Sequence, residues 1–191
     1  MPEYALLSKG PDTALEFCTC PCCLHVLLGG ICISALGATM HFVYEWSGCN
    51  TFAAVFCAVN ESVYEHIKIM LFPTLLWWCV VAIATSRLSD AFNAATCAMY
   101  LSLSLLLLGD GLAQIAEYES LAFDISLFVF CIFCGQAVGF VTFYNRWLTC
   151  YRIPLLALVI ALFTCTLFPP RWSYMFEDQR NHTYGRPEHC S

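Results

Sequence analysis

The residue types most able to do chemistry stand in one short stretch, where a long apolar segment begins. It reads Val59-Asn60-Glu61-Ser62-Val63-Tyr64-Glu65-His66-Ile67-Lys68. Asn60 is a good N-cap and Glu61 suits the positive end of a helix dipole, so we expect a helix to begin here. At about 100° per residue, Glu61, Glu65 and Lys68 fall on one face of that helix, and His66 lies on an adjacent face.

Two other apolar segments are expected to bring polar residues to the same side. His41 and Glu45 stand four residues apart near the end of the first segment, so they share a helix face. Asp124 lies near the start of the fourth segment. The predicted cluster therefore consists of His41, Glu45, Asn60, Glu61, Glu65, His66, Lys68 and Asp124.

Three interpretations fit this cluster, because charges in a membrane span cost several kcal/mol unless they pair or face water. The first is a divalent metal site that draws on His41, Glu61, Glu65 and His66, with a bound water as the nucleophile of a hydrolase. The second is a polar cavity that binds or transports an ion, a small solute or a lipid head group, with Lys68 neutralised by Glu65 or Glu61. The third is structural, with Glu65 and Lys68 paired at i,i+3.

The composition places these residues in a membrane protein. Of the 191 residues, 60% are hydrophobic and 12% are charged, against about 45–50% and about 25% in soluble domains. A chain this short cannot bury so much apolar surface in a core of its own, so the lipid bilayer is a predicted partner. The net charge is −6 and the eight Lys and Arg residues are scattered, which argues against a nucleic-acid partner.

Apolar runs long enough to cross a bilayer predict an all-α integral membrane helical bundle of about five transmembrane helices. A shorter apolar piece between the first two runs is expected to be re-entrant or interfacial. Residues 1–23 form a cysteine-rich N-terminal segment, 24–170 the helical domain and 171–191 a polar tail. The predicted spans are Leu24 to Tyr44, Ile67 to Ser86, Ala91 to Leu108, Leu121 to Tyr144, and Ile153 to Phe168.

The fourteen cysteines fall into groups with different expected roles. Four stand just before the first span, a position that suits palmitoylation, although a metal cluster is an alternative; they are Cys18, Cys20, Cys22 and Cys23. Cys131 and Cys134 form C-x-x-C inside a span, where core packing is the better interpretation. Cys49 and Cys190 share the side opposite the N-terminus and could pair if that side is oxidising.

The orientation of the chain rests on the polar tail. An odd number of spans places the two termini on opposite sides of the membrane. Asn181-His182-Thr183 is a glycosylation sequon, and Asn181 could be modified only on a lumenal or extracellular face. These features favour a cytosolic N-terminus.

Long motifs in the chain resemble those of a family of small, uncharacterised multi-pass membrane proteins with a domain of unknown function. The family pattern His-x-x-Tyr-x-Trp-Ser-Gly reads here as residues 41–48, and V-N-E-S-x-x-E-H-x-K reads as residues 59–68, followed by Pro73. A proline pair and F-x-D-x5-Y-G are matched by Pro169, Pro170, Phe176, Asp178, Tyr184 and Gly185. The resemblance implies the multi-pass architecture without naming an activity. It also suggests that Asp178 and Tyr184 fold back over the membrane face that holds Glu61.

Overall fold

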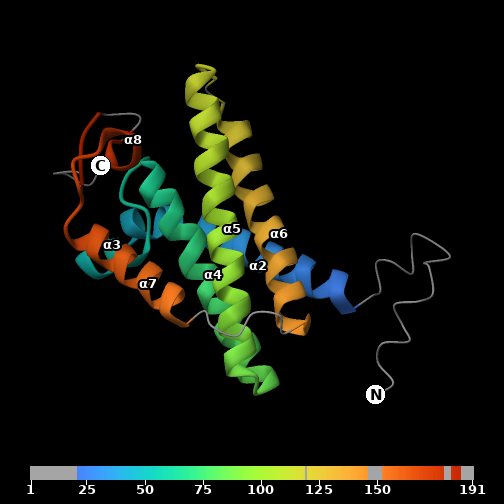
Figure 1. Ribbon diagram of the computed structural model, residues 1–191. Helices are drawn as coiled ribbons and strands as arrows, with labels where there is room; N and C mark the ends of the chain where they lie inside the picture. Colours follow the sequence, from blue (N-terminus) through green and yellow to red (C-terminus); the bar gives the residue numbers. More distant parts are fainter. Residues whose placement is uncertain (1–20, 119, 146–151, 179–181, 186–191) are drawn as a thin grey trace, which may run out of the picture.

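The computed structural model describes residues 21–118, 120–145, 152–178 and 182–185, without the side chains of residues 21–23 and 152. These residues form an all-α bundle (Figure 1). Four helices are long and apolar enough to span a membrane, and α7 is a shorter apolar helix, so the protein is an integral membrane protein. The helices are α2 (Pro21–Trp46), α3 (Thr51–Phe56), α4 (Val63–Thr85), α5 (Leu88–Ile115), α6 (Leu121–Asn145), α7 (Arg152–Leu167) and α8 (Ser173–Phe176).

The predicted fold class is confirmed, and the helix bounds differ mainly at their ends. Helix α4 begins at Val63, two residues later than an Asn60 N-cap would place it, because Ser62 and not Asn60 occupies the N-cap position. The 28 residues of α5 measure about 42 Å at 1.5 Å per residue, which exceeds a hydrocarbon core of about 30 Å. The predicted span, Ala91 to Leu108, was bounded by hydropathy, which does not detect the more polar helical turns at the two ends of α5. The 16 residues of α7 measure only about 24 Å.

Helices α5 and α6 form an antiparallel pair held together by small residues. A Cβ at Gly135 would lie 2.8 Å from the Ala98 carbonyl oxygen, and a Cβ at Gly139 would lie 3.2 Å from that of Ala94. Both glycines therefore let the two backbones approach closely, which is how helices associate in lipid. In the same seam, the Ser102 hydroxyl donates to the Cys131 carbonyl. This pair forms one wall against which α4 packs.

Helix α2 crosses the bundle and contacts α4 where a proline interrupts the hydrogen bonding of α4. Pro73 has no N–H to offer the carbonyl of Ile69, four residues earlier. A Cβ at Gly37 would lie 2.7 Å from that Ile69 oxygen, so only a glycine allows α2 to lie against it. This contact fixes α2 beside the first half of α4, and His41 lies one turn after Gly37 on α2.

The predicted short segment between the first two spans contains helix α3. Helix α2 ends in a tight turn in which Gly48 and Cys49 adopt positive φ values of 66° and 61°, and the Cys49 N–H donates to the Tyr44 carbonyl. Asn50 then caps α3 by accepting from the Phe52 N–H. The turn directs α3 back beside the start of α4, so that Ala54 is buried there.

One end of the bundle gathers the parts that build the candidate site. In Figure 1, the start of α4, the end of α7 and helix α8 lie together, with α3 beside them. After α8, the Glu177–Tyr184 bridge closes a loop in which the Asp178 N–H donates to the Thr183 carbonyl. The tail thus covers the beginning of α4.

Candidate functional site

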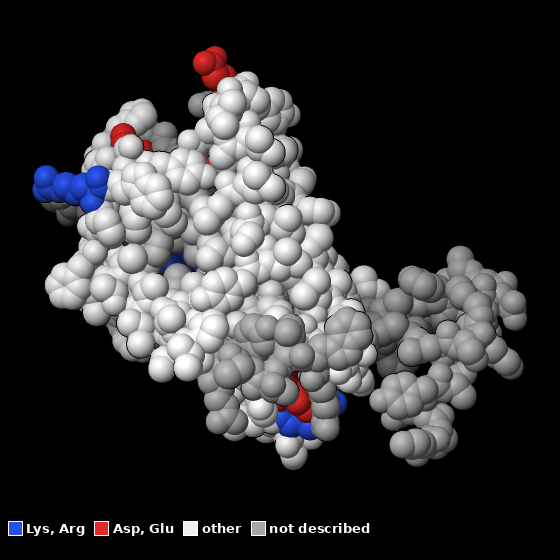
Figure 2. Space-filling view, viewed as in Figure 1, with Lys and Arg blue, Asp and Glu red and all other residues white. Residues whose placement is uncertain are grey.

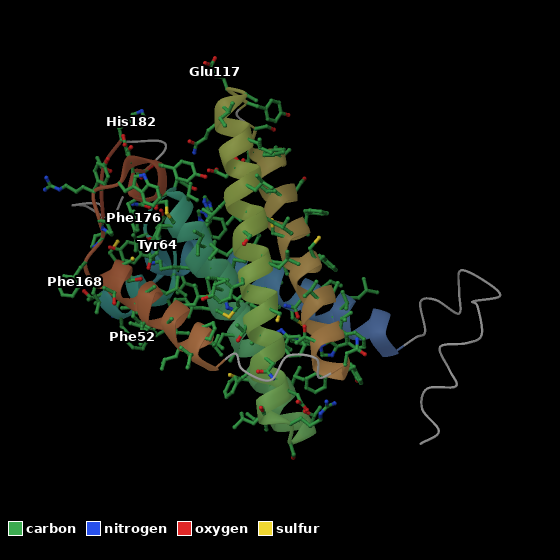
Figure 3. All side chains as sticks on the ribbon, in the orientation of Figure 1. Phe52, Tyr64, Glu117, Phe168, Phe176 and His182 are labelled. Carbon is green, nitrogen blue, oxygen red and sulfur yellow. The ribbon has the colours of Figure 1, made fainter. Side chains whose placement is uncertain are left out.

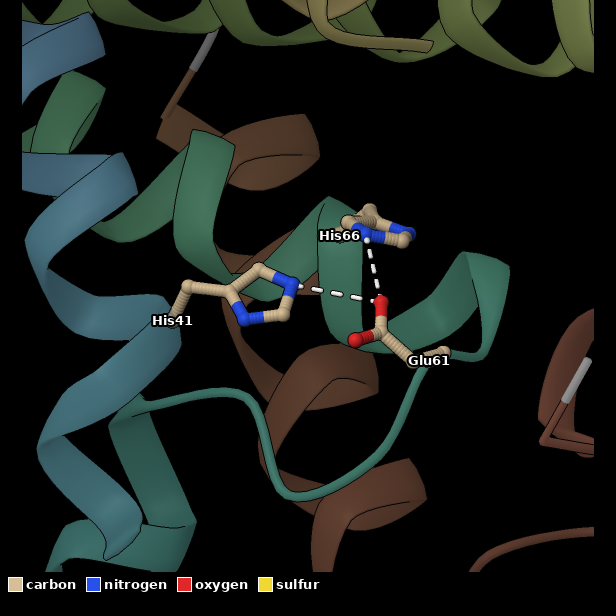
Figure 4. Close-up of side chains that lie close together, drawn as sticks. All are labelled: His41, Glu61 and His66. Carbon is tan, nitrogen blue, oxygen red and sulfur yellow. Dashed lines mark ion pairs between the residues drawn. The ribbon is translucent and has the colours of Figure 1, made fainter. Parts of the chain in front are cut away.

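Two histidines and a carboxylate meet between α2 and the start of α4. The Glu61 Oε2 atom lies 3.3 Å from His41 Nε2 and 3.6 Å from His66 Nε2. The two imidazole rings are 5.5 Å apart, and one potential ligand atom from each of the three residues lies within 4.8 Å of the others. Figure 4 shows both histidines directed at the same carboxylate. We call these three residues the His–Glu triad.

The triad combines three different local structures. His41 projects from α2, His66 lies in the first turn of α4, and Glu61 lies in the loop just before α4. The side chains are 24–31% exposed, so water can reach them. Ligands around a tetrahedral zinc ion with bonds of about 2.0–2.1 Å lie about 3.3 Å apart. The two distances from Glu61 to the histidines are close to this value, while the three ligand atoms as a set lie within 4.8 Å of one another.

A buried ion pair lies beside the triad, in the first two turns of α4. The Lys68 ammonium is 2.7 Å from Glu65 Oε2, and the two side chains are 1% and 8% exposed. Lys68 Nζ also donates to the Ala54 carbonyl of α3. Glu65 Oε2 accepts a second hydrogen bond from the Val59 N–H. The i,i+3 spacing sets the pair locally, and α3 supplies the carbonyl that completes it.

A cavity of about 270 Å³ adjoins this ion pair, between α4, the end of α7 and the tail. Figure 2 shows a hollow with basic atoms at its floor, and Lys68 is the basic residue in the cavity lining. Tyr64 and Phe176 form part of its wall and stack at 4.8 Å (Figure 3). The Tyr64 hydroxyl bonds to the Leu162 carbonyl and to Thr166. The cavity thus has charged, hydroxyl and apolar walls.

Asn60 connects the tail to the start of α4. Its Oδ1 accepts from the Ser62 N–H, and its Nδ2 donates to the Gly185 carbonyl. Gly185 has a φ of 78°, a conformation that glycine adopts without strain.

The tail residues Asp178 and Tyr184 differ in position: Asp178 is buried, whereas Tyr184 is exposed and donates to Glu177.

Besides Asn60 and Lys68, three more residues of the predicted cluster lie outside the triad. Glu45 is exposed one turn beyond His41, toward the end of α2, and it takes no part in the triad. Asp124 is exposed at the start of α6, and α6 is not one of the elements that carry the triad. Glu65 is held by Lys68, so the expectation that it could serve as a metal ligand is not supported by its geometry.

Comparison with known families places the chain. A model for a family of unknown function, DUF6512, matches residues 23–186. The chain belongs to the DUF6512 family. No curated protein and no solved structure matches it.

The DUF6512 match confirms the resemblance to an uncharacterised family. Within this DUF6512 protein, the two motifs singled out in the sequence supply all three residues of the triad and both residues of the ion pair. Sequence reasoning missed Tyr64, Thr166 and Phe176 as cavity walls. Two signals were available, because Tyr64 stands within the polar stretch and Phe176 within the F-x-D-x5-Y-G motif. Thr166 stands in neither motif.

Several predicted modification sites of this DUF6512 protein fall outside what the structure describes. Cys18, Cys20, Asn181 and Cys190 lie outside the described residues, and so do the side chains of Cys22 and Cys23. Cys49 is disulfide-bonded, and its partner is not among the cysteines whose side chains are described. Cys131 and Cys134 are both free thiols, and Cys131 is fully buried, as expected for a packing role.

Proposed function

We propose that this protein binds one divalent metal ion, best matched by zinc, at one end of its membrane bundle. The observation that carries the proposal is the convergence of His41, Glu61 and His66, whose ligand atoms lie within 4.8 Å of one another. Imidazole nitrogen and carboxylate oxygen are both good ligands for zinc. The Glu61 carboxylate would neutralise one of the two positive charges of the ion.

A metal-dependent hydrolase is the second candidate function. Two histidines and one glutamate form the protein ligand set of several catalytic zinc sites, which keep a fourth position for water. A zinc-bound water has a pKa near 7 and can act as a nucleophile. The partial exposure of all three side chains leaves room for a water and a substrate to approach.

The metal proposal is tested by measuring zinc directly. The protein is purified in detergent without chelators, and its metal content is determined by mass spectrometry, followed by competition titration with a zinc indicator. We expect one zinc per chain. In Glu61→Gln and His41→Ala, we expect affinity to fall by more than the roughly 10–100-fold that loss of an outer-shell partner costs.

The chain offers a matched control in the tail. His182 Nδ1 and Glu177 Oε1 lie 3.1 Å apart, but among the described residues no second histidine joins this pair in a potential metal site. His182→Ala should therefore keep full zinc binding. Wild-type protein without zinc, or zinc binding that survives loss of both Glu61 and His41, would overturn the proposal and leave the structural interpretation of the cluster.

The hydrolase candidate needs a further measurement. Zinc-loaded protein would be assayed against ester and phosphodiester substrates in mixed micelles. Activity that is lost on chelation, restored by zinc and abolished in Glu61→Gln would support an enzyme. Bound zinc without any such activity would favour an ion-binding or ion-transporting membrane protein.

A further inference from the structure

The cavity beside Glu65 and Lys68 is a second site, separate from the His–Glu triad. None of the triad residues lines it. We propose that this cavity binds a net-neutral zwitterion that carries a primary ammonium and an oxyanion, either as a lipid head group or as a free solute. The proposal does not depend on metal binding at the triad.

The charge balance of the cavity selects the net charge of its ligand. Lys68 and Glu65 are its two charged lining residues, and together they are neutral. A ligand with net charge would bring an uncompensated charge into a buried site, which is strongly disfavoured. A wholly apolar ligand would leave the hydroxyl and amide groups of the wall without water. A molecule with one positive and one negative group avoids both penalties.

Each member of the ion pair has bonding capacity left for such a ligand. The Lys68 ammonium has three N–H donors, and two of them serve Glu65 and the Ala54 carbonyl. The described hydrogen bonds of Glu65 both go to Oε2, which leaves Oε1 as an acceptor for a ligand ammonium. Ser62 lines the cavity and its hydroxyl makes no capping bond to α4, so it can bond the ligand oxyanion.

The depth and size of the cavity fit a small head group. Trp46, Phe168 and Trp172 are large, exposed aromatic residues at this end of the bundle, as is typical of a membrane–water interface. Leu167 and Pro169, from the end of α7, form part of the wall. The volume of about 270 Å³ lies just below the usual range of about 300–1,000 Å³ for ligand pockets, which favours a small polar molecule over a whole lipid.

The test compares ligands that differ in one property each. Isothermal titration calorimetry of the full chain in detergent would use glycerophosphoethanolamine, glycerophosphocholine, glycerol phosphate and glycine. We expect glycerophosphoethanolamine to bind at least about tenfold more tightly than glycerophosphocholine, because the trimethylated nitrogen has no N–H to donate to Glu65. Glycerol phosphate, which is anionic, should bind more weakly still.

Variants separate the site from the fold. Glu65→Leu combined with Lys68→Met replaces the ion pair by apolar groups of similar size and should abolish binding. Cys165→Phe fills the cavity without touching either charge and should also abolish it. The control is Arg87→Met combined with Asp90→Leu, which removes another i,i+3 ion pair at the far end of α4 and should leave binding unchanged.

Native mass spectrometry from nanodiscs distinguishes the two sources of the ligand. Retention of phosphatidylethanolamine over phosphatidylcholine by wild-type protein, lost in both cavity variants, would identify a lipid head group. Tight glycine binding without lipid selectivity would identify a free solute. Binding of neither, or equal binding by wild-type and cavity variants, would overturn the proposal. Binding of the zwitterion in the cavity should also survive removal of metal by a chelator. Failure of the cavity proposal can therefore be distinguished from failure of the metal proposal.

Discussion

Two groups of charged residues flank the start of α4, and they differ in their access to water. The His–Glu triad lies toward α2, with side chains 24–31% exposed. The Glu65–Lys68 pair lies toward α3 and the cavity, with side chains 8% and 1% exposed. In the triad, a carboxylate lies beside two imidazole nitrogens, and all three groups can coordinate a metal ion. In the pair, the positive charge of Lys68 and the negative charge of Glu65 neutralise each other.

The comparison shows how neighbouring residues of one motif can serve different ends. Glu61 and Glu65 are four residues apart, yet the loop before α4 turns Glu61 toward α2 while the helix holds Glu65 against α3. A partly exposed carboxylate such as that of Glu61 can exchange its histidine partners for a metal ion at little cost in free energy. A buried one depends on its partner, since an unpaired charge in lipid is expensive.

The largest effect is expected from breaking the buried pair. Lys68→Met leaves Glu65 buried without its cation and should lower the free energy of unfolding by about 3–5 kcal/mol. Glu65→Leu together with Lys68→Met should recover most of that loss, because a well-packed apolar pair often replaces a buried ion pair without cost. Unfolding in a denaturing detergent titration would measure both. Equal destabilisation by the single and double variants would contradict this assignment.

Zinc should stabilise the folded protein only when the His–Glu triad is intact, whether or not the Glu65–Lys68 pair is present. Zinc at 100 times its Kd should raise the free energy of unfolding by about 2.7 kcal/mol if the unfolded chain does not bind it. The same addition should leave Glu61→Gln unchanged, while Glu65→Leu with Lys68→Met should respond like wild type. Thermal unfolding with and without zinc measures the difference. A zinc response in Glu61→Gln would show that the ion binds elsewhere.

Without metal, the triad should contribute little to stability. Glu61→Gln keeps the shape of the side chain and removes a partly exposed charge, so its effect should be below about 1 kcal/mol. The same denaturing titration, run in the presence of a chelator, provides the measurement. A decrease in the free energy of unfolding as large as that of Lys68→Met would mean that the triad has a structural role. The triad and the buried pair would then not differ in their contribution to stability.

The smallest effect concerns the thiol beside the pair. Burial raises the pKa of Cys57 above its ordinary value of 9.0, so less of it is thiolate near neutral pH than of an ordinary cysteine, and the thiolate is the reactive form. Peptide mapping after brief maleimide treatment should find Cys57 unlabelled in the folded protein and labelled after denaturation. Rapid labelling of the folded wild-type protein would show that this side of the motif is open to water.

Local sequence spacing was sufficient for the features that depend on one helix. Apolar runs of about 20 residues fixed the membrane class and the approximate helices, because a chain in lipid must satisfy its backbone internally. The i,i+3 spacing of Glu65 and Lys68 likewise indicated their pairing in one of the three interpretations of the cluster, and the two side chains do pair. These results required no knowledge of how the helices pack.

Tertiary structure decided which polar residues meet. Helices that are apolar on most faces carry no sequence signal for which side contacts a neighbour, so Glu45 and Asp124 were as plausible as His41. Gly37 and the proline-freed carbonyl of Ile69 set how α2 lies on α4, and this contact brings His41 to Glu61. The positive-φ turn at Gly48 places α3, and the returning tail closes the cavity. Each of these depends on contacts between residues far apart in the chain.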